Sequence, residues 1–297
     1  MNYQKKIKLL MLISLLSILV IPSVLAKDFT VANSKDWRSL YLSTIYSGRS
    51  DSEFLFFTSL KDSQIKTKMM GVNDNILILE SKNQPVVKNY ESLLKIDGYE
   101  NYQTIYFEDY SELQTTLFQN LKTEGLFIMN PDFGMVAAVA SPYIIEKDYV
   151  PFFINGNNLD TAKLLSKGKD TLAVGRIPGR YLDKINAEEI LGDPDYVTQE
   201  IMHKVSSDMK GDWGLILNIQ EIDPQTLNQN LPIFIYFGDA YLKGIISAVK
   251  GSDITKFEVV GPSMPEVGKT IEAGTGKNLD LMLKYGRTIV NYPGMEG

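Results

Sequence analysis

The sequence predicts an α/β protein built from tandem modules with mostly parallel sheets. The first observation is that short apolar, β-branched or aromatic segments alternate with helical segments along the chain. The second is the supply of core residues, because 44% of the 297 residues are hydrophobic. The third is an internal repeat of the strand and helix pattern. This alternation favours parallel sheets covered by helices on both faces and joined by right-handed crossovers.

The composition excludes several classes of function. The chain has no Cys and one His, which excludes zinc sites built from these residues, thiol nucleophiles and iron–sulfur clusters. It carries 30 basic and 36 acidic residues, a net charge of −6, whereas nucleic-acid-binding proteins usually carry a basic excess. We therefore expect no cofactor and no nucleic acid partner.

Residues 1–26 are expected to be a secretory signal peptide. Three Lys precede a nearly unbroken apolar run over 9–20, Pro22 interrupts the apolar residues, and Ala26 offers a cleavage position. The run is shorter than the roughly 20 residues of a membrane-spanning helix, although an uncleaved anchor is the alternative. Removing the segment takes away three Lys and no acidic residue, so the net charge changes from −6 to −9. The membrane would then be involved only during export.

The expected strands are short apolar or aromatic runs bounded by polar residues. They lie at 29–32, 54–57, 76–79, 102–107, 125–129, 151–154, 171–174, 213–219, 233–237 and 257–260. Helices are expected where apolar residues recur every three or four positions, as Leu113, Leu117 and Leu121 do behind the expected N-cap Ser111. The helices lie at 36–46, 90–96, 111–121, 134–145, 159–165, 196–209, 241–249 and 279–285.

The repeat is marked by an Asp and an aromatic residue at the start of a helix. In two copies the pair closely follows a strand, and a weaker third copy has one residue between the Asp and the aromatic residue. The residues concerned are Asp36, Trp37, Asp132, Phe133, Asp239 and Tyr241. These copies suggest three modules after the signal peptide, at 27–110, 111–192 and 193–297.

Further features of the copies resemble the cell wall-binding repeat 2 family of secreted surface proteins. Residues 134–142, with the sequence Gly-Met-Val-Ala-Ala-Val-Ala-Ser-Pro, form an Ala-rich helix, and the Pro-led apolar strand 150–154 follows. Gly175 and Gly261 each stand after the last strand of a copy, as a Gly does in the family. The resemblance implies three Rossmann-like, three-layer modules around a pseudo-threefold axis. It also implies binding of anionic wall polymers without catalysis.

The six repeated residues are candidate binding residues. Open α/β sheets bind ligands beyond the carboxyl ends of their strands, where Asp36 and Asp132 are expected. Helix capping is the alternative for both, because Asp is also favoured at the N-cap. Core packing is the alternative for Trp37 and Phe133.

Several other motifs have a structural alternative to a functional one. Residues 261–270 end in Gly-Lys-Thr like a phosphate loop, but six residues separate the glycines and two of them are Pro, which favours a simple turn. Residues 274–278 could hold an anion together with Lys269, or form a turn. Residues 155–160 supply oxygen ligands for Ca²⁺, or an Asx turn before a helix.

Catalytic chemistry finds little support in the sequence. His203, the single His, lies on an expected helix without the neighbours of a catalytic triad. Pairs of carboxylates could serve a glycoside hydrolase, or simply be solvated. The pairs are Glu188 and Glu189, Asp193 and Asp195, and Asp51 and Glu53.

The sequence therefore predicts an exported, non-catalytic protein located at the cell surface or cell wall. Its expected partners are a cell-wall polymer or neighbouring surface-protein subunits. The alternatives are a structural subunit of a surface layer or an adhesin, and a solute-binding protein with two lobes and one cleft. The turn-like residues before Gly297 also suggest that the natural chain continues further.

Overall fold

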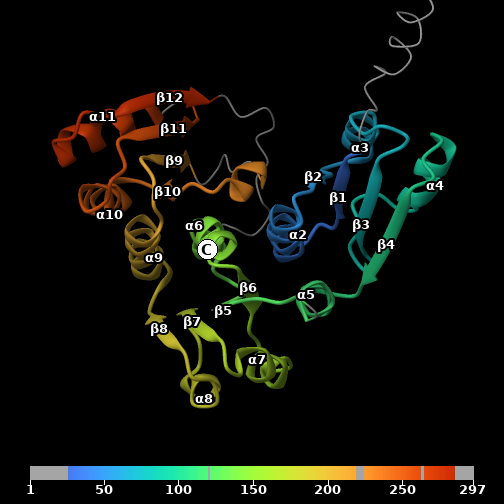
Figure 1. Cartoon of the computed structure of the whole chain (residues 1–297), viewed down its shortest axis with the longest axis horizontal. Helices are drawn as coiled ribbons and strands as arrows, with labels where there is room; N and C mark the ends of the chain where they lie inside the picture. Colours follow the sequence, from blue (N-terminus) through green and yellow to red (C-terminus); the bar gives the residue numbers. More distant parts are fainter. Residues whose placement is uncertain (1–25, 120, 219–223, 262–263, 285–297) are drawn as a thin grey trace, which may run out of the picture.

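The computed structural model describes residues 26–119, 121–218, 224–261 and 264–284. These residues form three four-stranded sheets in which every strand pairing is parallel, which confirms the predicted fold class. Figure 1 shows the sheets around a central group of helices, with module 1 in blue to teal, module 2 in green to yellow and module 3 in orange to red. The expected signal peptide, apart from Ala26, and the C-terminal end lie outside the described residues. Within the described ranges, no helix is long and apolar enough to cross a membrane.

Module 1 contains the sheet with strand order β2-β1-β3-β4. Its elements are β1 (Asp28–Asn33), α2 (Trp37–Arg49), β2 (Glu53–Phe56), α3 (Leu60–Thr67), β3 (Asn75–Ser81), α4 (Tyr90–Ile96) and β4 (Tyr102–Phe107). Successive side chains of a strand point to opposite faces, so each strand supplies two cores. On β1, Ala32 joins the core shared with α2, whereas Phe29 and Val31 join a second core with Tyr90 and Leu94 of α4.

Module 2 repeats this arrangement with strand order β6-β5-β7-β8. Its elements are β5 (Gly125–Met129), α6 (Gly134–Glu146), β6 (Tyr149–Phe153), α7 (Leu159–Ser166), β7 (Asp170–Gly175), α8 (Gly179–Leu182) and β8 (Glu188–Leu191). Pro151 lacks a backbone N–H and lies on the edge strand β6, where one side of the strand needs no partner strand. The α6 helix is apolar on all sides, and it is buried from Gly134 to Ile144.

Module 3 has the strand order β10-β9-β11-β12. Its elements are β9 (Trp213–Asn218), η2 (Pro224–Asn228), β10 (Ile233–Tyr236), α10 (Asp239–Lys250), β11 (Lys256–Val260), α11 (Met264–Thr275) and β12 (Asp280–Lys284). The helix predicted at 279–285 is wrong as far as the described residues reach, because β12 is a strand paired with β11. Apolar residues recur every second position at Leu279, Leu281 and Leu283, a strand period that the prediction overlooked.

The element after the first strand of each module lies at the centre of the molecule. These elements are α2, α6 and η2, and each contacts the other two. Asn228 of η2 donates a hydrogen bond from Nδ2 to the Ser47 hydroxyl of α2 over 2.8 Å. One hydrophobic cluster runs through all three modules at this centre. The three modules thus form one body around these elements, as Figure 1 shows for α2 and α6.

Two helices connect consecutive modules, α5 (Tyr110–Phe118) and α9 (Pro194–Asp208). Each packs against the central helix of the preceding module and the edge strand of the following one, so α5 contacts α2 and β6, and α9 contacts α6 and β10. The buried Gln114 of α5 extends the pairing of β6, because its amide exchanges two hydrogen bonds with the backbone of Phe153. The N-cap of α5 is Asp109 rather than the expected Ser111, since its carboxylate accepts from two backbone N–H groups.

Candidate functional site at the carboxyl edge of the sheets

An Asn stands at the end of the first strand in each module. Asn33 and Asn218 end β1 and β9, and Asn130 directly follows β5. The Asn33 amide donates to Glu80 Oε2 over 2.8 Å and accepts from the backbone N–H groups of Val86 and Val87. It thereby ties the loop after the third strand to the first strand.

Asn130 plays the same part in module 2. Its Nδ2 donates to the backbone carbonyl of Arg176 over 2.9 Å, and its Oδ1 accepts from the Asp132 backbone N–H over 2.7 Å. Gly175 lies beside it with a φ of 108°, and a Cβ there would stand 3.0 Å from the Phe133 ring. Only glycine combines this backbone conformation with this close approach. The resemblance to the wall-binding repeats rested partly on this Gly.

The predicted Asp36 is the N-cap of α2. Its Oδ1 accepts from the Arg38 backbone N–H and, over 2.8 Å, from the Arg38 side chain Nε, and its Oδ2 accepts from the Ser39 hydroxyl over 3.1 Å. The Ser34 hydroxyl accepts from the Asp36 backbone N–H. The capping alternative is therefore correct for Asp36, and capping also orients Arg38.

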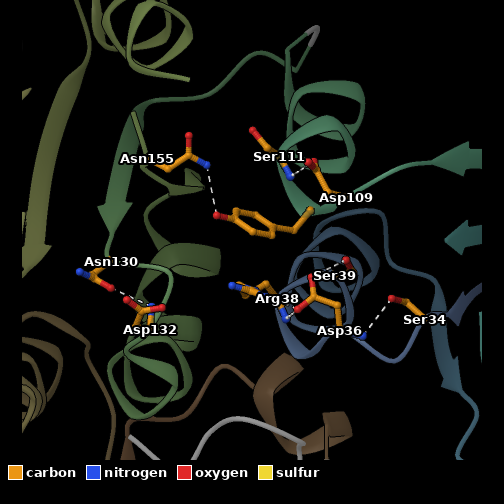
Figure 2. A network of polar contacts seen from close by, with 10 residues as sticks. Ser34, Asp36, Arg38, Ser39, Asp109, Ser111, Asn130, Asp132 and Asn155 are labelled. Atoms are coloured by element: carbon orange, nitrogen blue, oxygen red, sulfur yellow. Dashed lines mark hydrogen bonds and ion pairs between the residues drawn. The ribbon is translucent and has the colours of Figure 1, made fainter. Parts of the chain in front are cut away.

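Arg38 extends the site from module 1 toward module 2. Its guanidinium carbon lies 4.5 Å from the centre of the Tyr110 ring on α5, and the side chain is 30% exposed. The Tyr110 hydroxyl accepts from Asn155 Nδ2, just after β6, over 3.2 Å. Figure 2 shows this network around the starts of α2 and α5. The arrangement holds a cation in place on an aromatic face while leaving it accessible to solvent.

The predicted Asp132 differs from Asp36 in its role. The N-cap of α6 is Phe133, which makes no side-chain capping hydrogen bond, and the Asp132 side chain is exposed. Two exposed cations stand close to this edge, Arg176 after β7 and Arg180 on α8, whose guanidinium lies 5.4 Å from the Tyr181 ring. Three of the four Arg in the described residues therefore lie near the carboxyl ends of the sheets in modules 1 and 2. We call Asp36, Arg38, Tyr110, Asn130, Asp132, Asn155 and Arg176 the carboxyl-edge site.

The predicted aromatic residues lie in the core rather than on a binding surface. Trp37 is 5% exposed and meets Phe153 edge to face at 5.4 Å, and Phe133 is 8% exposed. Tyr241 is 1% exposed and donates to Asp195 Oδ1, and its burial raises the pKa of the phenol. These rings are fully used in packing, which argues against direct contact with a ligand.

The third copy of the repeat was aligned to the wrong strand. Asp239 is exposed at the start of α10 and follows β10, which corresponds to β2 and β6 at the sheet edge. The counterpart of β1 and β5 is β9, which ends at Asn218. The Asn that follows each first strand was the signal for the correct alignment. The residues that follow Asn218 directly lie outside the described part of the chain.

The other motifs form structural features. Gly268 lies inside α11 rather than at a helix start, which rules out a phosphate loop there. Lys277 donates to the backbone carbonyls of Val249, Ser252 and Ile254, so it caps the C-terminus of α10 rather than binding an anion. Asn155 Oδ1 accepts from two backbone N–H groups in an Asx turn. Among the described residues, no group of three or more His, Asp or Glu side chains could hold a metal ion.

The single His and the acidic pairs also have ordinary surroundings. His203 lies half-buried on α9. Glu188 pairs with Lys204 over 3.2 Å, and Asp193 is the N-cap of α9 through a bond from the Tyr196 backbone N–H. The residues of the carboxyl-edge site that the sequence did not point to are Arg38, Tyr110, Asn130 and Arg176. Arg38 could have been noticed as an Arg two positions after a capping Asp, but its stacking on Tyr110 depends on tertiary structure.

Comparison with known proteins supports the fold. No family model matches the chain, and no curated protein matches it. Among solved structures it is similar to Cwp8 from Clostridium difficile, a cell wall protein, with a TM-score of 0.67 and 16% sequence identity. The alignment covers 84% of this chain and 48% of that chain, so this chain spans about half the length of that protein. The comparison shows that the three-module α/β arrangement is a fold shared with that structure.

Proposed function

We propose that this protein is exported and acts without catalysis at the cell surface, where it associates with an anionic polymer of the cell wall. The observation that carries the proposal is the Arg38 guanidinium, which is held by Asp36 and Tyr110 yet stays accessible at the carboxyl edge. Guanidinium groups bind phosphate and carboxylate groups in a bidentate manner. The similarity to a cell wall protein supports the location.

The neighbouring charges suit a repetitive anionic ligand. Arg176 and Arg180 add two exposed cations close to the carboxyl edge of module 2, beside the partly exposed Arg38 of module 1. The protein as a whole is acidic, with a net charge of −6, so it would repel an anionic polymer except where cations are concentrated. The exposed carboxylate of Asp132 lies at the same edge. Because it would repel phosphate groups, it would limit how many of them bind there.

Sedimentation with purified cell walls tests this proposal. The exported chain should sediment with walls that retain their phosphate-containing polymers and stay in solution after these polymers are removed with hydrofluoric acid. Arg38→Gln keeps a polar side chain of similar length and should weaken binding about ten-fold, the effect of losing a charge-assisted contact. Added salt should weaken wild-type binding as well.

The control is Lys250→Ala, which removes an exposed cation from the end of α10 in module 3. It should leave sedimentation unchanged, because this residue lies outside the carboxyl-edge site. Equal loss of binding in both variants would mean that overall charge is responsible. Undiminished binding by Arg38→Gln would contradict the proposed site.

A structural subunit of a surface layer or an adhesin is the second candidate. It is favoured by exposed apolar side chains in modules 1 and 3, namely Leu60, Ile65 and Met69 at α3, and Met282 and Leu283 on β12. Such side chains fit contacts between protein subunits. Sedimentation velocity over a range of concentrations should then show self-association that Ile65→Ser reduces. The three-sheet arrangement gives no support to a two-lobed solute-binding protein.

A further inference from the structure

Module 1 contains a second polar feature at the amino ends of its strands. A cleft of about 470 Å³ opens beside β1, β3 and β4. This volume lies within the range of small-molecule binding pockets. The floor is a row across three strands formed by Thr30, Leu77 and Gln103, which are register partners. Tyr46 and Ser50 at the end of α2 form one wall.

The cleft is open because α5 is too short to cover this part of the sheet. Its nine residues span about 13 Å, whereas the six residues of β4 span about 20 Å. The last residue of α5, Phe118, meets Tyr46 edge to face at 6.2 Å. Among the described residues that line the cleft, none comes from α5.

The lining is polar but almost uncharged. Asp28 is the single charged side chain among the lining residues, and its Oδ1 already accepts from Asn75 Nδ2 over 2.8 Å. Asn101 and Gln103 present exposed amides. The hydroxyls of Thr30, Ser50 and Ser52 form a chain of hydrogen bonds of 2.7 and 3.0 Å along one side. In the part of the chain that the structure describes, no Lys or Arg lines the cleft.

Two tyrosines complete the chemistry of the cleft. Tyr46 and Tyr102 are half-buried at its walls and provide apolar ring surface next to a hydroxyl group. Amides and hydroxyls both donate and accept hydrogen bonds, as the hydroxyl groups of a sugar do. A ligand with a net negative charge would meet Asp28 without any compensating cation. The ligand class that matches this lining is therefore neutral and rich in hydroxyl groups.

We propose that this cleft binds an uncharged oligosaccharide. The site is separate from the carboxyl-edge site and independent of the function proposed for it. A second cleft, of about 460 Å³ next to α9, has different chemistry, because Glu188, Glu200 and Lys204 line it. Its charged lining does not match an uncharged sugar as the module 1 cleft does.

Calorimetric titration of the exported chain with neutral tetrasaccharides tests the proposal. The probes are the tetramers of N-acetylglucosamine, glucose and mannose, and at least one should bind with a millimolar or lower Kd. Gln103→Ala removes an exposed amide from the floor and should weaken that binding about ten-fold. Tyr46→Phe, which keeps the packing against Phe118 and removes only the hydroxyl, should weaken it by about three-fold or more.

Two controls separate this site from other surfaces. Gln119→Ala removes an exposed amide just beyond α5 and should leave the Kd unchanged. Arg38→Gln should also leave sugar binding unchanged, whatever its effect on wall polymers. The proposal is overturned if none of the three sugars binds, or if Gln103→Ala binds as tightly as Gln119→Ala. Displacement of the bound sugar by a glycerol phosphate oligomer would equally contradict a neutral-sugar site.

Discussion

Modules 1 and 2 have the same strand order, but they differ in the connecting helix that covers the sheet face turned toward the centre of the molecule. In module 2, α9 has 15 residues and runs about 22 Å, which is longer than the four-residue edge strand β8. In module 1, α5 has nine residues and leaves the amino half of β4 uncovered. The difference shows that the lengths of the connecting helix and of the edge strand beneath it together decide how much of a repeated sheet is covered.

A second difference lies at the carboxyl edge. In modules 2 and 3, a Gly at the end of the third strand lies beside the Asn at the end of the first strand. These residues are Gly175 in module 2 and Gly261 in module 3, and both have a positive φ. In module 1 the partner of Asn33 is Glu80, which is 8% exposed. Module 1 therefore replaces a glycine turn by a buried carboxylate that hydrogen-bonds the same Asn. Module 1 therefore differs from module 2 at both ends of its sheet, at the amino ends through the short α5 helix and at the carboxyl ends through Glu80.

The largest expected effect on the free energy of unfolding comes from replacing Leu79, one of two leucines on the same face of β3. Leu79 is fully buried in the core shared with α2, so Leu79→Ala should lower the free energy of unfolding by about 3–4 kcal/mol. Leu77 lies two residues away on the open floor of the cleft, and Leu77→Ala should cost about 1 kcal/mol. Urea denaturation of both variants measures the difference. Equal losses would show that the sheet is covered along its whole length.

The next effect concerns how the short α5 helix is attached. Gln114→Ala should lower the free energy of unfolding by about 1–3 kcal/mol, because it leaves the buried N–H group of Phe153 without its partner, whereas the Phe153 carbonyl still accepts from Asn158 Nδ2. Thr116→Ala, at an exposed position of the same helix, should cost less than about 0.5 kcal/mol. If the two variants unfold at the same urea concentration, the polar anchor does not hold α5.

The smallest effect concerns the buried carboxylate of module 1. Desolvation raises the pKa of Glu80 above its ordinary value of 4.5, against the lowering effect of the Asn33 hydrogen bond. A carboxyl whose pKa is raised in the folded state stabilises the fold only while protonated, so this contribution is lost as the pH rises through the folded pKa. Glu80→Gln keeps an acceptor for Asn33 and should be more stable than wild type near pH 7 by no more than about 1 kcal/mol.

The pH dependence provides the check on this last variant. The stability advantage of Glu80→Gln should shrink as the pH falls through and below 4.5, because the carboxyl then becomes protonated in both folded and unfolded chains. Thermal unfolding followed by circular dichroism at several pH values measures it. If the stability advantage of Glu80→Gln instead grew toward low pH, the pKa of Glu80 would be lowered in the folded state rather than raised.

Much of the fold could be predicted because strand and helix periods are local properties of the sequence. The runs at 29–32 and 125–129 were recognised as strands from their apolar residues, and helix capping was given from its position as the alternative to ligand binding for Asp36. The strand β12 was missed because its alternation is only five residues long and competes with a helical spacing of leucines. The module boundaries drawn from the sequence and the signal peptide remain predictions.

The candidate site was harder to predict because its residues come from separate elements. Asp36 and Asp132 were identified, but their aromatic neighbours Trp37 and Phe133 turn inward to the core. Arg38 gains its place on Tyr110, 72 positions further along the chain, through the packing of α5 against α2. No periodicity in the sequence reports such a contact.

By itself, the sequence determined most of the alternation of strands and helices, the parallel α/β class and the exclusion of Cys-based and His-rich chemistry, although it missed α3, α8, β8 and α11 and gave β12 as a helix. Hydrophobic patterning and composition act locally, so they can be read without knowing which segments meet. Only the tertiary structure decided that β9 rather than β10 is the counterpart of β1, and that α5 leaves part of its sheet open. Strand order and helix coverage depend on contacts between distant segments, and the energy of these contacts comes from packing rather than local propensity.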